Sequence, residues 1–287
     1  KQAPCGAKRK MANGFAGLIF FSFSCLAFAQ DLPMTFCKKM VGDIAGSDVN
    51  VCEKVEWMSS CESVNKHPIF HFDKKGQSEK SGFKVLVLGL IHGDEPISGR
   101  LAFEWIKRLE GIEPRNSWRI LPVVNPDGLA LKTRTNANKV DLNRNFPTKD
   151  WTQEALKYWK ALAHGEPRRY PGDQAASEPE TKCVREHLKD FKPDFIVSVH
   201  TPYAVLDFDG PKVDFPHYRS LPWRALGNFP GSLGRYMWKD RSVPVLTVEL
   251  KDKMVDPAEL QDVIGHLVIA TNKKIDLRLR AKVFDSL

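Results

Sequence analysis

The sequence predicts an α/β fold with a mixed, mostly parallel central sheet flanked by helices. Two observations carry this prediction. Strand-like and helix-like patterns alternate along the chain, and the strand-like segments are continuous apolar runs rather than alternating ones. A strand that is covered by helices on both faces has this pattern. With 287 residues, 42% of them hydrophobic, the chain can form one large domain.

The predicted elements follow one another in the order that a largely parallel sheet requires. The first strand, at residues 83–90, is followed by a helix at 96–109 whose apolar side chains recur on one face. The further strands are expected at 118–124, 194–199 and 243–248, and the further helices at 179–190 and 257–277. Two motifs punctuate them: the turn signal NPDG at 125–128 and a capping-box pattern, SEPE, at 177–180.

Residues 1–29 have the composition of a signal peptide. Lys8, Arg9 and Lys10 precede an uncharged, mostly apolar stretch at 15–28, and an A-x-A cleavage pattern ends at Ala29. The apolar run is too short for a stable membrane-spanning helix, which needs about 20 residues. We therefore expect export to the periplasm, with a cysteine-containing segment at 30–80 and the main domain at 81–287.

The cysteine count bears on the cellular compartment, and the net charge bears on the possible binding partners. Four cysteines remain after the leader, and an even number in an exported chain suggests up to two disulfides with three possible pairings, or buried thiols: Cys37, Cys52, Cys61 and Cys183. The net charge is +8. No stripe of Lys and Arg interleaved with aromatic residues accompanies it, so we expect no nucleic-acid partner.

Three candidate metal ligands follow two of the predicted strands. His92 and Glu95 lie three residues apart after the first strand, and His200 ends the strand at 194–199. In such sheets the ligand site lies beyond the carboxyl ends of the strands. Two ligands on a short segment and a distant third are typical of catalytic zinc sites, which keep an open coordination position. Taken singly, the same residues also fit a polar turn and a hydrogen-bonded strand-end histidine.

Several blocks in a fixed order make the chain resemble the M14 (carboxypeptidase A-like) zinc carboxypeptidases, most closely the murein peptide amidase branch. The resemblance covers about residues 63–249. It rests on HGDEP at 92–96, NPDG at 125–128, KTR at 132–134, DLNRNFP at 141–147, SEPET at 177–181, His200 and TVEL at 247–250. It implies a zinc carboxypeptidase-like fold, with 81–287 as the catalytic domain and one zinc ion on His92, Glu95 and His200.

The resemblance also implies the catalytic residues. Glu249, which ends an apolar run, would act as general base and return the proton to the leaving amine. Arg134 would stabilise the negative charge that develops on the carbonyl oxygen. Asn143 and Arg144 would bind a substrate carboxylate, because a guanidinium matches a carboxylate bidentately. The alternative for both arginines is a surface ion pair.

The chain departs from the digestive carboxypeptidases where those enzymes place a mobile tyrosine. Tyr203 follows His200 in a different context, and Tyr236 lies in the expected region but at a different spacing from Glu249. The segment at 203–211 resembles the peptidoglycan-processing branch. We expect Tyr203, Asp207 and Asp209 to line a specificity pocket in which an acid meets an ammonium group of diaminopimelate. The alternative is a strand and turn with solvated acids.

These observations predict a secreted zinc metallopeptidase that hydrolyses peptidoglycan stem peptides at the bond between γ-D-glutamate and meso-diaminopimelate. The alternatives are a general metallocarboxypeptidase on L-peptides, an acyl-amino-acid deacylase of the succinylglutamate desuccinylase or aspartoacylase type, and a wall-binding module without activity. Amidases of the resembling branch are typically intracellular. The leader is therefore a departure that favours wall remodelling over recycling.

Overall fold

The computed structural model describes residues 24–77, 82–275 and 284. The chain divides into two compact units, Lys1–Leu32 and Pro33–Leu287. Most of the predicted leader lies outside the described residues, and the described part of the first unit is the start of helix α1 (Ser24–Gly42). In the described part of the chain, no helix is both long and apolar enough to cross a membrane.

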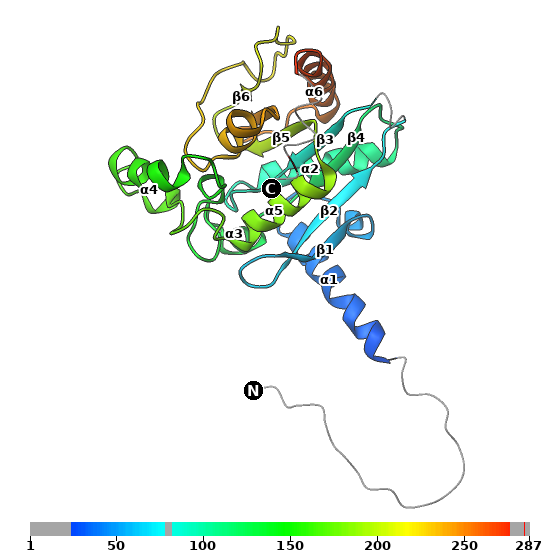
Figure 1. The fold of residues 1–287 in the computed structure, drawn as a ribbon. Coiled ribbons are helices and arrows are strands. Elements are labelled where there is room, and N and C mark those ends of the chain that lie inside the picture. The colour runs from blue at the N-terminus through cyan, green and yellow to red at the C-terminus, as the bar shows by residue number, and fades with distance from the viewer. Residues whose placement is uncertain (1–23, 78–81, 276–283, 285–287) are drawn as a thin grey trace, which may run out of the picture. The chain divides into compact units, whose positions relative to one another are not determined.

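A seven-stranded sheet forms the centre of the second unit (Figure 1). Its spatial order is β1-β2-β4-β3-β5-β7-β6. The strands are β1 (Glu56–Glu62), β2 (Pro68–Lys74), β3 (Lys84–Leu88), β4 (Ser117–Leu121), β5 (Phe195–His200), β6 (Val205–Asp209) and β7 (Val245–Glu249). The four central strands are parallel, whereas β1, β2 and β6 pair antiparallel with their neighbours. The predicted mixed sheet is confirmed.

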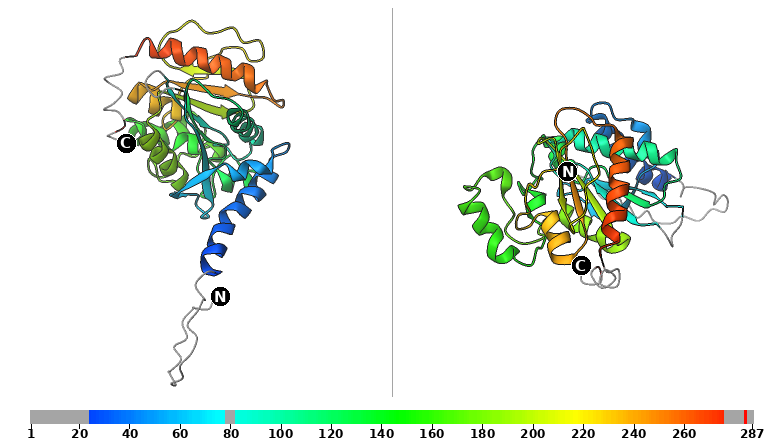
Figure 2. Two further views of the ribbon diagram at one scale, coloured as in Figure 1. Left: turned by 90° about the vertical axis from the view of Figure 1, so that its right-hand side faces the viewer. Right: turned by 90° about the horizontal axis from the view of Figure 1, so that it is seen from above.

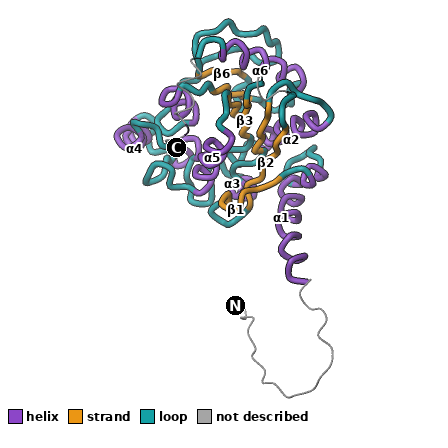
Figure 3. Tube along the Cα trace, turned by 45° about the vertical axis from the view of Figure 1, so that its right-hand side comes forward, coloured by secondary structure: helices purple, strands orange, loops and turns teal. Residues whose placement is uncertain are grey.

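Helices cover both faces of the sheet, as Figures 2 and 3 show. Val85 and Val87 of β3 belong to a core that also contains side chains of α2 (Pro96–Glu110) and α6 (Pro257–Asn272). Leu86 and Leu88 belong to a second core with side chains of α5 (Pro179–Phe191). Successive side chains of a strand point to opposite faces. The continuous apolar run of β3 therefore fills two cores at once.

The connections between the parallel strands leave the centre of the sheet in opposite directions. From β3 the chain passes through α2 to β4, which lies on one side of β3. Strand β5 lies on the other side of β3, and β7 is the next strand outward in the sheet. A crevice forms at the carboxyl ends of two neighbouring strands whose connections diverge in this way. The topology thus places the ends of β3 and β5 next to each other.

Two local motifs behave differently from their sequence patterns. The predicted capping box at 177–180 is wrong: helix α5 does begin at Pro179, but its N-cap Glu178 makes no side-chain capping bond. The Ser177 hydroxyl donates to Glu178 instead. The NPDG turn opens a short helix, α3 (Pro126–Leu131), in which the Asn125 side chain caps the amide of Gly128 at 2.8 Å. The carboxylates of the SEPE block thus accept hydrogen bonds from residues elsewhere in the fold. The Asn125 side chain instead bonds to a backbone amide close to it in the sequence.

Several elements lacked a clear sequence signal. They are helix α1, strands β1 and β6, helix α4 (Trp151–Ala161) and a π-helical turn at Arg235–Lys239. Strands β1 and β2 flank the turn at Asn65 and Lys66, where Lys66 adopts a φ of 66°. The last helix ends at Asn272, five residues before the predicted end.

The cysteine-containing segment is part of the same sheet as the main domain. Its strands β1 and β2 extend the edge next to β4. Disulfides join Cys37 to Cys52 and Cys61 of β1 to Cys183 of α5. No residue between Pro33 and Gln77 lines the pocket described below. The described part of this segment therefore supports the fold rather than blocking the site.

The two disulfides should differ in their contribution to stability. The Cys61–Cys183 bond closes a sequence separation of 122 residues and the Cys37–Cys52 bond one of 15. Loop-closure entropy predicts losses of about 5 and about 3 kcal/mol in the free energy of unfolding when each is removed. Urea denaturation of the C61A/C183A and C37A/C52A proteins beside the parent measures both. A larger loss for C37A/C52A would contradict this expectation.

Candidate active site

The first part of the site is the tight segment between β3 and α2. His92 and Glu95 lie on it, and Glu95 is the N-cap of α2. A Cβ on Gly93 would lie 2.0 Å from the backbone carbon of Gly128, so only glycine fits between these two backbones. The segment therefore packs directly against α3. The side chains of His92 and Glu95 are buried beyond the end of β3.

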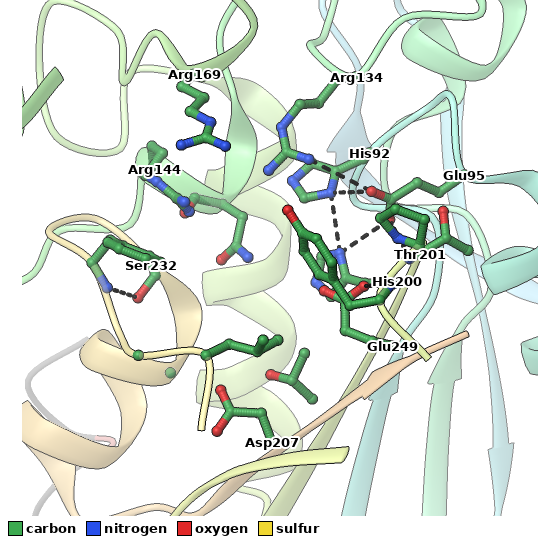
Figure 4. Close-up of a pocket in the computed structure, with 18 of the residues that line it drawn as sticks. His92, Glu95, Arg134, Arg144, Arg169, His200, Thr201, Asp207, Ser232 and Glu249 are labelled. Carbon is green, nitrogen blue, oxygen red and sulfur yellow. Dashed lines mark hydrogen bonds and ion pairs between the residues drawn. The ribbon is translucent and has the colours of Figure 1, made fainter. Parts of the chain in front are cut away.

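His92, Glu95 and His200 converge at the carboxyl ends of β3 and β5 (Figure 4). His92 Nδ1 lies 2.9 Å from Glu95 Oε1 and 3.1 Å from His200 Nδ1, and His200 Nδ1 lies 3.1 Å from Glu95 Oε2. The Thr201 amide also donates to Glu95 Oε2 at 3.2 Å. The structure therefore brings together the three ligands that the sequence predicts.

The far nitrogen of each histidine ring has its own hydrogen-bond partner. His92 Nε2 lies 3.1 Å from Asp141 Oδ1, and His200 Nε2 lies 2.9 Å from Ser198 Oγ. Proton donation from each Nε2 leaves each Nδ1 with its lone pair toward Glu95. The sequence patterns predicted a role for neither partner, although Asp141 begins the DLNRNFP block and Ser198 lies two residues before His200.

The donor set fits a zinc ion. Two nitrogens and a carboxylate are a common ligand set for catalytic zinc, and the ligand atoms lie within 4.8 Å of one another. Two atoms bound to one tetrahedral zinc at about 2.0–2.1 Å would be about 3.3 Å apart. The spacings of 2.9–3.1 Å between the donor atoms here are close to that value.

Buried charge around the histidines favours a cation. Burial and Arg134 act to lower the pKa of His92, but the carboxylates of Glu95 and Asp141 outweigh them and raise it. Burial would raise the pKa of Asp141, yet Arg134 and His92 hold it well below its usual range. Arg134 Nε donates to Asp141 at 3.0 Å, and its Nη1 lies 3.6 Å from Glu95. The same carboxylates that raise the pKa of His92 would attract a metal ion.

Glu249 lies at the end of β7, directly beside His200 of β5 in the parallel ladder. It is 7% exposed, and burial raises the pKa of its carboxyl although His200 opposes this shift. The Tyr203 amide donates to Glu249 Oε2 at 3.4 Å. A carboxylate with a raised pKa at the edge of the metal-ligand cluster has the properties of a general base.

Arg144 and Asn143 line the same pocket, and Figure 4 shows Arg144 across it from Glu249. Arg144 is half-buried and has no direct ion pair with an acid of the described residues, although Asp141 acts on its charge from a greater distance. Its Nη1 donates to the Asn143 carbonyl at 2.7 Å, and its guanidinium lies over the Phe229 ring. Burial lowers the pKa of Arg144. Asn143 Oδ1 accepts from the Leu233 amide at 2.9 Å, which leaves its amide nitrogen as a donor. A guanidinium without a direct ion pair in a pocket is suited to a carboxylate ligand.

Acidic side chains of β6 line another part of the pocket, whose volume is about 670 Å³. Burial, and then the neighbouring Asp209, raises the pKa of Asp207 to about 6. Asp209 Oδ1 accepts a hydrogen bond from Asn228 at 2.8 Å, and burial raises its pKa. The segment is a strand, as the alternative interpretation had it, but both acids face the pocket.

The two candidate tyrosines have different environments. Tyr203 is 60% exposed and lines the pocket. Tyr236 does not reach it: the side chain is fully buried, stacks on Phe146 and receives a hydrogen bond from Arg185 at 3.3 Å. The π-helical turn directs this ring into the core, so the expectation that Tyr236 contacts substrate is wrong.

A buried polar network supports the loop that carries Asp141. The Asn136 side chain donates to Glu178 at 2.7 Å and to Glu180 at 3.0 Å, and its Oδ1 accepts from the amides of Asn138 and Val140. Burial raises the pKa of Glu180 to about 7. These bonds satisfy the polar groups of the loop and hold Asp141 against His92.

Comparisons with known proteins agree with this geometry. The zinc carboxypeptidase family model matches residues 60–209. A murein peptide amidase A of Vibrio campbellii is 31% identical over 205 residues, which cover 66% of this chain and 77% of that protein.

Solved structures share the fold. A murein-tripeptide amidase from Escherichia coli O157 aligns with a TM-score of 0.51 at 23% identity, over 75% of this chain and 91% of that one. A carboxypeptidase A from Helicoverpa armigera aligns with a TM-score of 0.55 at 16% identity, over 91% and 81%. The family match, with the three converging ligands and the adjacent Glu249, leads to one conclusion: the chain belongs to the zinc carboxypeptidase family and is a hydrolase of peptide bonds.

Proposed function

We propose that this protein is an exported zinc metallopeptidase that cleaves peptidoglycan stem peptides between γ-D-glutamate and meso-diaminopimelate. The observation that carries the proposal is the charge pattern of one pocket. The candidate metal ligands and Glu249 line one pocket with Arg144, whose guanidinium has no direct ion pair among the described residues, and with two acids, Asp207 and Asp209. A residue with a free carboxylate and a distant ammonium group matches this pattern.

The catalytic roles follow from the positions of the side chains. His92, Glu95 and His200 would hold one zinc ion, which when bound lowers the pKa of water and polarises the substrate carbonyl. Glu249 takes a proton from the attacking water and delivers it to the leaving amine. Arg134 lies beside the ligands and supplies N–H donors to the negative charge that develops on the carbonyl oxygen.

Substrate orientation follows from the other side of the pocket. Arg144 and Asn143 bind the carboxylate next to the scissile amide, and Asp207 with Asp209 binds the ammonium group of diaminopimelate. Two amidases whose names refer to murein peptides match this chain in sequence or in fold, which supports the choice of substrate. Both acids are part-buried, so an ammonium partner would offset the cost of desolvating them.

The disulfides support export. Disulfide bonds persist in oxidising compartments such as the periplasm and are rare in the cytosol. The two bonds found here involve all four cysteines that follow the predicted leader. Together with the leader composition, they favour an enzyme that meets wall peptides outside the cytoplasm.

The proposed bond is tested by mass spectrometry of purified muropeptides incubated with the zinc-loaded protein and with Glu249→Gln. We expect the parent to release diaminopimelate or a peptide that begins with it. Loss of the general base should lower kcat by roughly 10²–10⁴-fold. Removal of only a C-terminal residue from ordinary L-peptides would overturn the bond and the substrate while leaving the zinc mechanism intact.

Metal content is tested independently of turnover. We expect about one zinc ion per chain by elemental mass spectrometry, because a three-ligand site holds a single ion. Replacing His200 with alanine should abolish stoichiometric zinc, whereas Glu249→Gln should retain it because Glu249 is not a ligand. Equal zinc content in the parent and the H200A protein would refute the assigned ligand set.

The Asp207 carboxyl should impose a pH dependence on substrate choice. Its pKa is raised to about 6. The side chain is therefore neutral below that pH and carries the charge that attracts ammonium above it. The ratio of kcat/KM for a diaminopimelate peptide to that for its 2-aminopimelate analogue, which lacks the distal ammonium, should fall as the pH decreases through about 6. Asp207→Asn should remove this dependence, and a ratio independent of pH in the parent would exclude it.

A further inference from the structure

We propose that Arg169 is a second substrate-binding arginine, which together with Arg144 binds the single carboxylate next to the scissile amide. The inference rests on the proposed function and adds a specificity-determining residue to it. Arg169 ends a short 3₁₀ turn at Pro167–Arg169, in the loop that joins α4 to α5. The sequence patterns predicted no role for this loop.

Two hydrogen bonds to backbone carbonyls hold this loop against the segment at 141–145. The Asp141 amide donates to the Tyr170 carbonyl at 2.8 Å, and the Asn145 side chain donates to the Pro171 carbonyl at 2.8 Å. The first arginine lies between the two donors in the sequence, and the second directly precedes the two acceptors. Both arginines therefore extend from stretches of backbone that are fixed to each other.

The guanidinium groups of Arg144 and Arg169 lie side by side at the pocket. Both residues line it, and Figure 4 shows the two groups next to each other and apart from Asp207. Burial lowers the pKa of Arg144 most, and the positive charges of Arg134 and Arg169 add to this effect. Like charges at the wall of one cavity create a positive potential there, which an anion between them relieves.

Arg169 has no ion pair with an acid in the part of the chain that the structure describes. Arg168, its neighbour in sequence, pairs with Asp94 at 2.6 Å, so that guanidinium is already engaged. Glu166, the acid of the same turn, accepts a hydrogen bond from the Arg168 backbone amide at 3.3 Å. The guanidinium of Arg169, like that of Arg144, thus remains available for an acid of the substrate.

One carboxylate can bind both guanidiniums. Its two oxygens offer about four acceptor sites, which is enough for a pair of N–H donors from each arginine. In a stem peptide, the carboxyl next to the scissile amide is free only when diaminopimelate is the last residue. A further residue turns this carboxyl into an amide, which has no charge and a single acceptor oxygen. Arg144 and Arg169 together should therefore select stems that end at diaminopimelate.

The test uses two synthetic peptides that differ only at this carboxyl. One is L-Ala-γ-D-Glu-meso-diaminopimelate, and in the other the carboxyl next to the scissile amide is a carboxamide. Values of kcat/KM are measured for the parent, for Arg169→Gln and for a matched control, Arg219→Gln. Arg219 is also exposed but lies outside the pocket lining.

We expect the parent to prefer the peptide with the free carboxylate. R169Q should lower kcat/KM for that peptide about 5–30-fold, which lies between the losses typical of an exposed ion pair and of a hydrogen bond to a charged group. The same variant should change kcat/KM for the carboxamide by less than about twofold, because the carboxamide has no charge for Arg169 to bind.

The outcomes separate this inference from the proposed function. Equal losses on both peptides in R169Q, no loss on the free acid, or equal use of both peptides by the parent would overturn the role of Arg169. An equal loss on the free acid in R219Q would assign the effect to net charge and would also overturn it. Failure of the parent to cleave either peptide would overturn the proposed function and this inference with it. Thermal unfolding of each variant checks that the fold is retained.

Discussion

The site depends on one constraint: the carboxyl ends of β3 and β5 must meet, so that His92 and His200 present their Nδ1 atoms 3.1 Å apart. The chain leaves these neighbouring strands in opposite directions, which opens the crevice between them. Asp141 and Ser198 hold the far nitrogens of the two rings. Without both the strand pairing and these hydrogen bonds, the imidazoles could not aim at one point with Glu95.

Electrostatic balance explains how so many charges can be buried together. Glu95 lies within reach of Arg134 and of both histidines, and Asp141 lies within reach of Arg134 and His92, so each buried charge has a counter-charge or a hydrogen bond. Across the pocket the balance is incomplete, because the Arg144 guanidinium has no direct ion pair among the described residues and two carboxyls with raised pKa values face the same cavity. Incomplete compensation of this kind is costly for the free protein and favours a ligand that carries the opposite charges.

The residues that hold the loop of Asp141 in place are polar and come from distant parts of the chain. Asp127 of the NPDG block accepts hydrogen bonds from the Ser63 hydroxyl, the Asn65 amide and His67, which ties the turn between β1 and β2 to α3. Glu180 accepts from the Val64 amide on the other side of the same turn. The Cys61–Cys183 disulfide links the same two regions covalently. The N-terminal strands therefore brace the loop that orients Asp141.

The sequence by itself determined the central strands and the helices between them, and it predicted the candidate metal ligands and Glu249, because each depends on a local pattern or on a block of residues at the end of a strand. Tertiary structure alone decided the disulfide pairing, the buried position of Tyr236, and the partners of Glu178 and Glu180. These features depend on contacts between residues that are far apart in the chain. Hydrophobic periodicity and capping rules describe only neighbours within a few residues, so they could not reveal them.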